Sequence, residues 1–157
     1  MAKKKSKAKE ENVTGIYPVN FYFSVSFDSS EGIDFQEVSG LTREQTIEEV
    51  AGGGENRFKY RLPSVSISKN LILKRAVILK GDALTNWCKD SIDGGLAKPI
   101  KTKTVSVNLL NSEGQVSMKW NFYKAYPVKY SFSDLKSQTG EVLIDTIELA
   151  YIHFTSS

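Results

Sequence analysis

Polar and apolar residues alternate along several stretches of the chain, which is the pattern of β-strands with one buried face. The first stretch covers residues 19–27, and the turn-forming residues 28–32 separate it from a second stretch over 33–38. Further along, alternation covers residues 104–109 and 116–122, with turn-forming residues 111–114 between them. Each pair of stretches predicts a β-hairpin.

One α-helix is predicted over residues 82–93. Asp82 is suited to cap its N-terminus, and Gly94 with Gly95 is suited to a left-handed stop after it. The apolar residues that follow at helical spacing are Leu84, Trp87, Cys88 and Ile92. This stripe should pack across one end or face of a sheet.

Three segments break the alternating pattern. Residues 40–63 hold mixed charges and a triple glycine, which predicts a long exposed loop. Residues 70–79 are rich in β-formers and carry two apolar triplets around Lys74 and Arg75, so this strand is buried on both sides or changes face. Near the C-terminus the apolar positions switch parity between Ile144 and Ile147, which predicts a bulge near Asp145 or Thr146.

Many antiparallel strands with a single helix indicate a mainly β fold, an antiparallel β-sandwich or barrel with one flanking α-helix. The length of 157 residues suits one domain. Residues 15–157 are expected to form it. Residues 1–14 are rich in lysine and poor in apolar side chains, so they are expected to be a flexible tail. The apolar runs are shorter than the roughly 18 residues that a membrane-spanning helix needs.

The net charge of +3 comes from the start of the chain. Five of the 21 basic residues and two of the 18 acidic residues lie in the first 11 positions, which leaves 16 of each in the remainder. A neutral body is weak support for nucleic-acid binding. The lysine-rich start lacks the apolar core of a secretory signal, and a single cysteine, Cys88, fits synthesis in the cytoplasm.

The sequence contains no recognisable set of catalytic residues. Cys88 and His153 are the only pair that suggests nucleophilic catalysis, and isolated residues of these types are more often structural. Neither a metal-ligand spacing nor a phosphate-binding glycine loop occurs, so no enzyme activity, metal or cofactor is expected. The triple glycine Gly52, Gly53 and Gly54 is better explained as a flexible turn.

A set of short motifs, in a fixed order, carries a family resemblance. They are residues 35–41 (FQEVSGL), 52–56 (GGGEN), 62–63 (LP), 70–75 (NLILKR), 84–87 (LTNW), 120–122 (WNF) and 125–129 (AYPVK). In this order the chain resembles the tail tube proteins of phages and related contractile injection systems, from about residue 17 to residue 154. Each motif alone is weak, whereas the ordered set is specific.

The resemblance implies a ring-forming subunit of an inner tube. Six copies would form a ring whose inner sheets join into one barrel, and rings would stack into a hollow tube that a contracting sheath drives through a target envelope. Ring closure would also remove free sheet edges, which otherwise invite aggregation. The long exposed loop over residues 40–63 would reach neighbouring subunits. Its interface candidates are Gly52, Gly53, Gly54, Glu55, Asn56 and Arg57.

In this architecture the polar face of the inner sheet lines the lumen. The lumen candidates are Ser106, Asn108, Ser117, Lys119 and Asn121, with Ser24 and Ser26 as further members if the first strand belongs to the inner sheet. The same residues could instead coat the outside of the assembly.

Alternative functions stay open at this point. A tube initiator or baseplate protein would share the fold, and a β-barrel that binds nucleic acid or a small ligand is a more distant alternative. The expected partners are other copies of the chain, sheath and baseplate proteins, and cargo in the lumen. The expected location is a phage tail or tail-like injection particle assembled from subunits made in the cytoplasm, without insertion of the subunit into a membrane.

Overall fold

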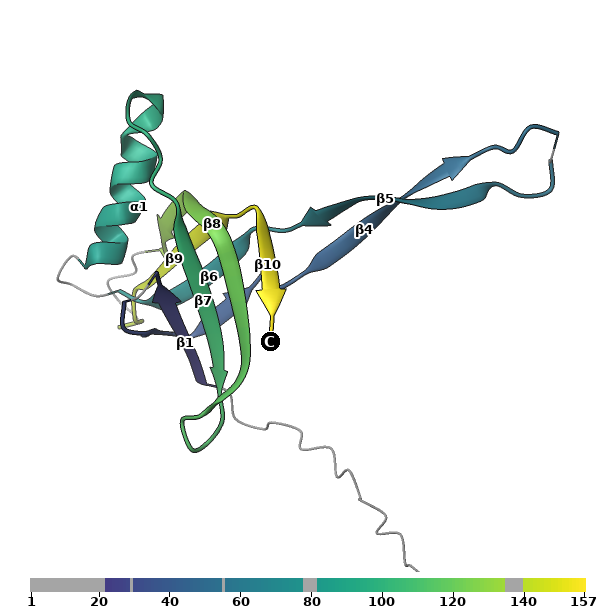
Figure 1. The fold of residues 1–157 in the computed structure, drawn as a ribbon. Helices are drawn as coiled ribbons and strands as arrows, with labels where there is room; N and C mark the ends of the chain where they lie inside the picture. Colours follow the sequence, from purple (N-terminus) through teal and green to yellow (C-terminus); the bar gives the residue numbers. More distant parts are fainter. Residues whose placement is uncertain (1–21, 29, 55, 78–81, 135–139) are drawn as a thin grey trace, which may run out of the picture.

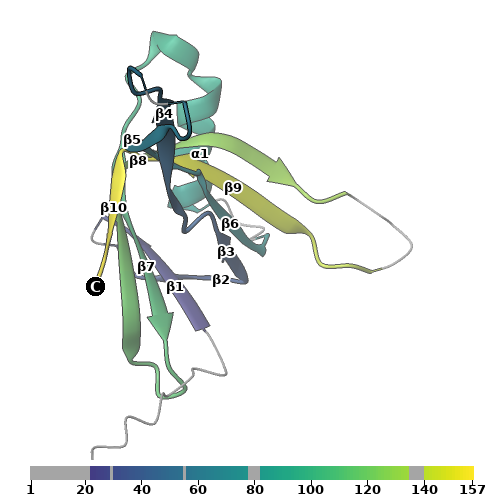
Figure 2. The same ribbon diagram turned by 90° about the vertical axis from the view of Figure 1, so that its right-hand side faces the viewer.

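Most of the strands form one curled antiparallel sheet (Figures 1 and 2). The structure is a computed structural model, and it describes residues 22–28, 30–54, 56–77, 82–134 and 140–157. The eight strands of this sheet within those residues are β1 (Tyr22–Phe27), β2 (Ile33–Phe35), β3 (Glu37–Ser39), β6 (Leu71–Ala76), β7 (Lys103–Leu110), β8 (Val116–Phe132), β9 (Ile144–Ala150) and β10 (His153–Ser156). Their order is β2-β1-β7-β8-β9-β6-β3, and β10 pairs with β8. The mainly β, antiparallel fold class is confirmed.

The two ends of the sheet meet at Gln36, so the sheet curls without closing into a complete barrel. The predicted strand over 33–38 is in fact two short strands, because β2 pairs with β1 while β3 pairs with β6 at the far end of the sheet. Gln36 joins them, and its backbone N–H donates to the Lys74 carbonyl at 2.9 Å. The first predicted strand begins in the structure at Tyr22, so its residues 19–21 lie outside the described residues, as does the predicted tail over 1–14.

The two halves of strand β8 pair with different strands. Its first half pairs with β7 and β10, and its second half pairs with β9. Lys124 has a φ of 53°, and the register with β9 shifts between Pro127 and Lys129. Proline has no N–H to donate to a ladder, which is why it is accommodated beside a bulge. The predicted hairpin over 104–109 and 116–122 is confirmed, and β8 runs ten residues beyond it, to Phe132.

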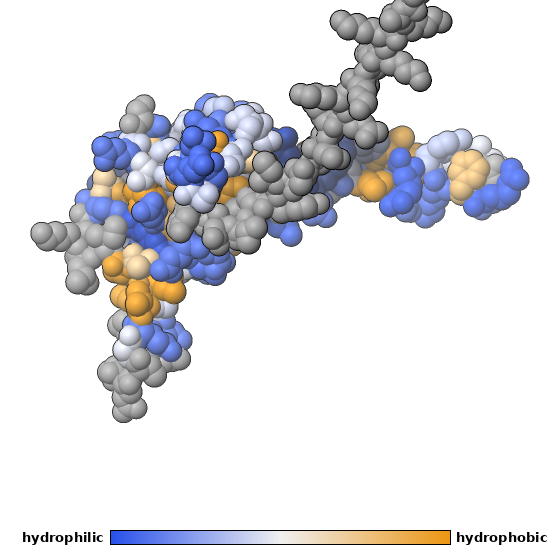
Figure 3. All heavy atoms as spheres, turned by 90° about the horizontal axis from the view of Figure 1, so that it is seen from below, coloured by the Kyte–Doolittle hydropathy of each residue, from blue (hydrophilic) through white to orange (hydrophobic). Residues whose placement is uncertain are grey.

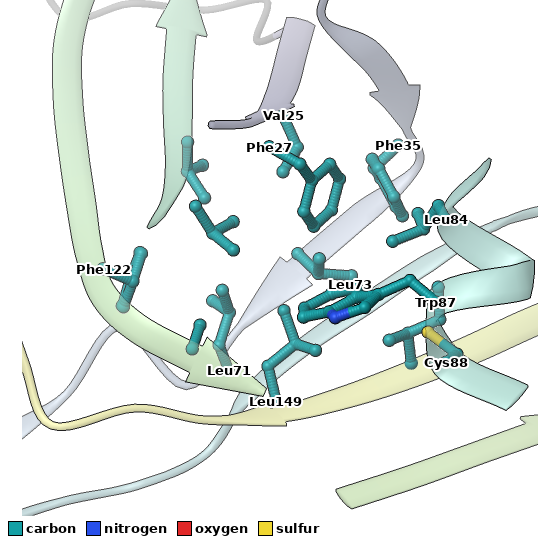
Figure 4. Close-up of a cluster of buried hydrophobic side chains, with 14 of the residues drawn as sticks. Val25, Phe27, Phe35, Leu71, Leu73, Leu84, Trp87, Cys88, Phe122 and Leu149 are labelled. Carbon is teal, nitrogen blue, oxygen red and sulfur yellow. The ribbon is translucent and has the colours of Figure 1, made fainter. Parts of the chain in front are cut away.

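The helix α1 (Ala83–Asp93) covers one side of the core (Figure 4). The Asp82 side chain accepts a hydrogen bond from the Thr85 backbone N–H at 2.9 Å, which confirms it as the N-cap. After the helix Gly95 takes a positive φ of 53°, and a short 3-10 turn, η1 (Gly95–Ala97), follows. The inner side chains of α1 are Leu84, Trp87 and Cys88. The prediction that Ile92 belongs to this stripe is wrong, because 38% of its surface is exposed.

The core is built from the alternating apolar positions. Buried side chains from seven strands and α1 meet in one cluster, which Figure 4 shows around Leu73 and Trp87. Trp87 contacts the Phe27 ring edge-on, with 6.0 Å between ring centroids. No helix in the described part of the chain combines the length and the apolar character needed to cross a membrane.

The predicted bulge near Asp145 or Thr146 is wrong. Strand β9 pairs with β6 without a register shift, from Leu149 opposite Leu71 to Ile144 opposite Ala76. Inward-facing and outward-facing residues alternate regularly along β9. Asp145, which is only 1% exposed, occupies one of the inward-facing positions.

Most of the predicted loop over residues 40–63 belongs to a second, two-stranded sheet. Strands β4 (Arg43–Val50) and β5 (Tyr60–Ser68) pair as a long antiparallel hairpin that projects away from the body (Figure 1). The prediction of an irregular loop is therefore wrong, although the predicted exposure is correct. At its root Gly40 has a φ of 91°, and a Cβ there would lie 2.0 Å from the Asn70 carbonyl oxygen. Only glycine fits this turn without displacing the backbone of residue 70.

Candidate assembly surfaces

The long hairpin has one face that is largely apolar. Cross-strand pairing puts Val50 opposite Tyr60 and Glu48 opposite Leu62, so these four side chains share a face. The Phe58 ring packs edge-on against Tyr60, with 5.4 Å between centroids. We call Val50, Phe58, Tyr60, Leu62 and Glu48 the apolar face of the hairpin. Its four apolar members are 41–52% exposed, and hydrophobic surface is visible on the hairpin in Figure 3.

The opposite face of the hairpin is stabilised within the hairpin itself. Glu49 lies opposite Arg61, and its carboxylate is 3.6 Å from the Lys59 ammonium. Ile47 lies opposite Pro63 on the same side. This face therefore carries an ion pair within the hairpin and one exposed aliphatic side chain, Ile47, whereas the apolar face gathers four large exposed side chains.

A two-stranded hairpin is at best marginally stable alone in water. Its root is held by Arg43, whose guanidinium carbon lies 4.2 Å from the centroid of the Phe154 ring. Beyond that point no element of the sheet covers the apolar face. Contiguous exposed apolar surface of this kind marks a site of association.

The predicted interface residues lie together at the tip of the hairpin. Gly52, Gly53, Gly54, Asn56 and Arg57 connect β4 to β5, and Glu55 lies outside the described residues. Gly54 has a φ of 84°, a conformation that favours glycine. A Cβ at Gly52 would lie 2.8 Å from the Tyr60 ring, so this glycine makes room for an aromatic side chain. Their role in an interface stays a prediction.

The apolar face was missed by sequence reasoning, which concentrated on the glycines. Tyr60 and Leu62 are two residues apart and Glu48 and Val50 are two residues apart, as one strand face requires. The signal was available, but mixed charges on both strands obscured it.

Four of the five lumen candidates form one polar face. Ser106 pairs with Asn121, and Asn108 pairs with Lys119, on the side of β7 and β8 that points away from the core. The Ser106 hydroxyl donates to the Asn121 side-chain oxygen at 2.7 Å. Neighbouring strands extend this face with Ser24, Ser26 and Thr155.

The fifth candidate, Ser117, is less well placed. It is exposed and lies where the register of β7 and β8 shifts, between the pairs of Leu109 and Leu110. Whether the polar face lines a lumen remains a prediction.

A buried charge cluster ties α1 to the sheet. The Arg75 side chain on β6 is only 3% exposed, and its Nε donates to Asp145 on β9 at 3.1 Å. Its Nη2 donates to the Thr85 hydroxyl at 3.1 Å, and the guanidinium also pairs with Asp82, the N-cap of α1. Burial opposes ionisation of Asp82, but hydrogen bonds from Arg75 and Thr85 outweigh it and hold the pKa of Asp82 well below its usual range. Burial raises the pKa of Asp145 despite the nearby guanidinium.

Cys88 and His153 occupy unrelated environments. Cys88 is completely buried in the core, and burial raises the pKa of its thiol to about 12. His153 is exposed on β10 and stacks on the Tyr123 ring, with 4.6 Å between centroids. Within the described ranges no three or more His, Cys, Asp or Glu residues gather as metal ligands would.

Comparisons with known proteins agree with this architecture. The chain is similar to a subunit of the sheath/tube terminator of an extracellular contractile injection system, PVC, with 24% identity, a TM-score of 0.77, and coverage of 90% of this chain and 97% of that chain. It is similar to a subunit of the PVC sheath-tube complex, with 21% identity, a TM-score of 0.76, and coverage of 97% and 99%. Hcp1 from Flavobacterium johnsoniae is more distant, with 16% identity, a TM-score of 0.59, and coverage of 87% and 95%. These likenesses show the fold.

The family follows from the sequence. No curated protein sequence matches the chain significantly. The family described as T4-like virus tail tube protein gp19, however, matches residues 19–155, which is nearly the whole chain. The chain therefore belongs to the T4-like virus tail tube protein family, and it is a structural subunit of a tail tube.

Proposed function

We propose that six copies of this chain form a ring, and that rings stack into the inner tube of a contractile tail or injection system. The observation that carries the proposal is the long hairpin, whose apolar face finds no cover within its own subunit. Contacts between subunits would cover it, and the sheet edges at β2, β3 and β10 would pair or be shielded in the same assembly.

The polar face of β1, β7, β8 and β10 lines the lumen in this proposal. Serine, asparagine and threonine side chains dominate it, and Lys119 is its cation. Such a wall is hydrated and nearly neutral, so it binds passing cargo weakly. Proteins in the similar structures are described as sheath-tube complexes, which supports a sheath as the external partner and a tail-like particle as the location.

Thiol labelling of assembled tubes tests the proposal. The Asn108→Cys variant should react with a small and a bulky maleimide before assembly, and with the small one alone after assembly, because the lumen excludes the bulky reagent. The control Lys89→Cys places a thiol on an exposed position of α1 and should react with both reagents in both states. Buried Cys88, with its raised pKa, should contribute little background, which the unchanged chain measures.

Two results would contradict the proposal. One is equal labelling of the Asn108→Cys variant by both reagents in intact tubes, which would place the polar face outside. The other is a chain that stays monomeric at every protein and salt concentration.

A further inference from the structure

The apolar face of the long hairpin has a defined chemistry. Its aromatic residues Phe58 and Tyr60 lie near the tip, and Glu48 provides a negative charge beside Leu62. Glu48 forms no ion pair with the residues that the structure describes, in contrast to its neighbour Glu49. A complementary surface must therefore offer apolar area, space for an aromatic ring and a positive charge.

A surface with these properties lies at the end of α1. Ile92, Leu96 and Ile100 are exposed by 38%, 100% and 44%, which is unusual for three aliphatic residues so close in sequence. Lys98 and Lys101 lie in the same segment. We call these five residues the α1 patch.

The α1 patch includes a preformed cavity. A hollow of about 240 Å³ lies between α1 and the segment after η1, and its walls include Trp87, Pro99 and Ile100 together with Lys98 and Lys101. Asp90 also contributes to the wall, so the lysines outnumber the acid by two to one. A cavity of this size accepts an aromatic side chain.

The wall of the cavity is held in place before any partner arrives. The Trp87 indole Nε1–H donates to the Lys101 carbonyl at 2.8 Å, which fixes the segment against α1. The Lys103 ammonium lies 5.4 Å from the centroid of the same indole ring. A preorganised site loses less entropy on binding, so this anchoring favours docking.

The hairpin cannot reach the α1 patch of its own subunit. Figure 1 shows α1 and the long hairpin projecting from opposite sides of the sheet, and Figure 2 looks along the hairpin with α1 behind it. A contact between two different patches on opposite sides is heterologous, and such contacts generate rings or filaments. We propose that the apolar face of the long hairpin docks onto the α1 patch of a second copy of this chain. The inference rests on the proposed function and names the surface that receives the hairpin.

In this contact Phe58 or Tyr60 enters the cavity beside Trp87. Glu48 meets Lys98 or Lys101 at its rim. The exposed aliphatic residues of the two surfaces cover one another, and the ion-paired face with Glu49 stays toward solvent.

Photo-crosslinking in the assembled full-length chain tests the docking. A benzoylphenylalanine replaces Tyr60, and a matched control replaces Ile47, which lies on the opposite face of the same hairpin. Mixing isotopically heavy and light chains separates contacts between copies from contacts within one copy. Crosslinks from position 60 to residues 87–101 of another copy are expected, and position 47 should not give them. Crosslinks from position 60 to another region, or within one copy, would overturn the inference.

A charge exchange provides an independent measurement. The Glu48→Lys variant should raise the protein concentration needed for assembly by about tenfold, as expected for a charge pair in an interface. Adding Lys98→Glu or Lys101→Glu should restore assembly. The control Glu49→Lys lies on the face that stays toward solvent and should leave the assembly concentration unchanged. Failure of both exchanges to restore Glu48→Lys would overturn the inference even though the unchanged chain assembles, whereas an unchanged chain that never assembles would overturn the proposed function.

Discussion

Replacing Arg75 by methionine is expected to destabilise the folded subunit by about 3–5 kcal/mol, the usual cost of leaving a buried charge without its partner. The Arg75 and Asp145 side chains are 3% and 1% exposed, so water cannot compensate the carboxylate that remains. The variant also loses the bond to Asp82 that ties the start of α1 to β6. Guanidinium unfolding of unassembled protein, followed by tryptophan fluorescence, measures the change.

The preceding residue supplies a matched control. Lys74 lies on the opposite face of the same strand, and both side chains of its ion pair with Glu37 are solvent-exposed. Lys74→Met should therefore lower the free energy of unfolding by at most about 1 kcal/mol. The loss caused by Arg75→Met should also shrink as pH falls. Burial already raises the pKa of Asp145, removal of the cation raises it further, and the protonated carboxyl is cheaper to bury. Equal effects of the two substitutions, or a loss independent of pH, would contradict the role of the cluster.

Replacing residues 50–60 by Asn-Gly is expected to abolish assembly and to leave a folded monomer. The change keeps Glu49 opposite Arg61 across a two-residue turn and removes the tip with most of the apolar face. None of the removed side chains belongs to the core cluster, so the Tm should change by less than about 4 °C. Sedimentation velocity reports the assembly state, and thermal unfolding reports the fold.

A control substitution checks that the loss is specific. Ile47→Ala removes a comparable exposed apolar side chain from the opposite face of the hairpin and should leave assembly intact. If the shortened chain still forms tubes, the hairpin is not an assembly element. If the shortened chain unfolds, the hairpin instead stabilises its own subunit.

Elements that bury one face within the subunit were predictable from the sequence. The hairpin of β7 and β8 follows strict alternation because Val105, Val107 and Phe122 pack into the core while their neighbours do not. Helix α1 was predictable from local chemistry, because an aspartate cap and a glycine stop satisfy backbone groups at its ends. Both signals depend on interactions near in sequence or on a single buried face.

The long hairpin escaped prediction because neither of its faces is buried in the subunit. Strands β4 and β5 carry apolar and charged residues on both sides, and their register shifts between Gln45 and Ile47, which removes the period of two. The prediction therefore located the exposed segment and its glycine tip but assigned it no regular structure. A strand with both faces exposed in the monomer lacks the regular alternation of apolar and polar residues by which strands are predicted.

The charge cluster escaped prediction for a different reason. The sequence predicts a bulge near Asp145 or Thr146 because the apolar positions switch parity between Ile144 and Ile147. In the structure Arg75 keeps the parity of Leu71 and Leu73, and Asp145 keeps the parity of Ile147 and Leu149. Two opposite charges on core parity in two strands would have been the signal, but their pairing depends on strand order, which the sequence does not reveal.

Cryo-electron microscopy of tubes assembled from the purified full-length chain tests the central claim most directly. We expect stacked six-fold rings in which the long hairpin leaves its own subunit and contacts another, while β1, β7, β8 and β10 present their polar face to a hollow lumen. Tubes whose inner wall is formed by α1, hairpins folded back on their own subunits, or a preparation that yields neither rings nor tubes would contradict it.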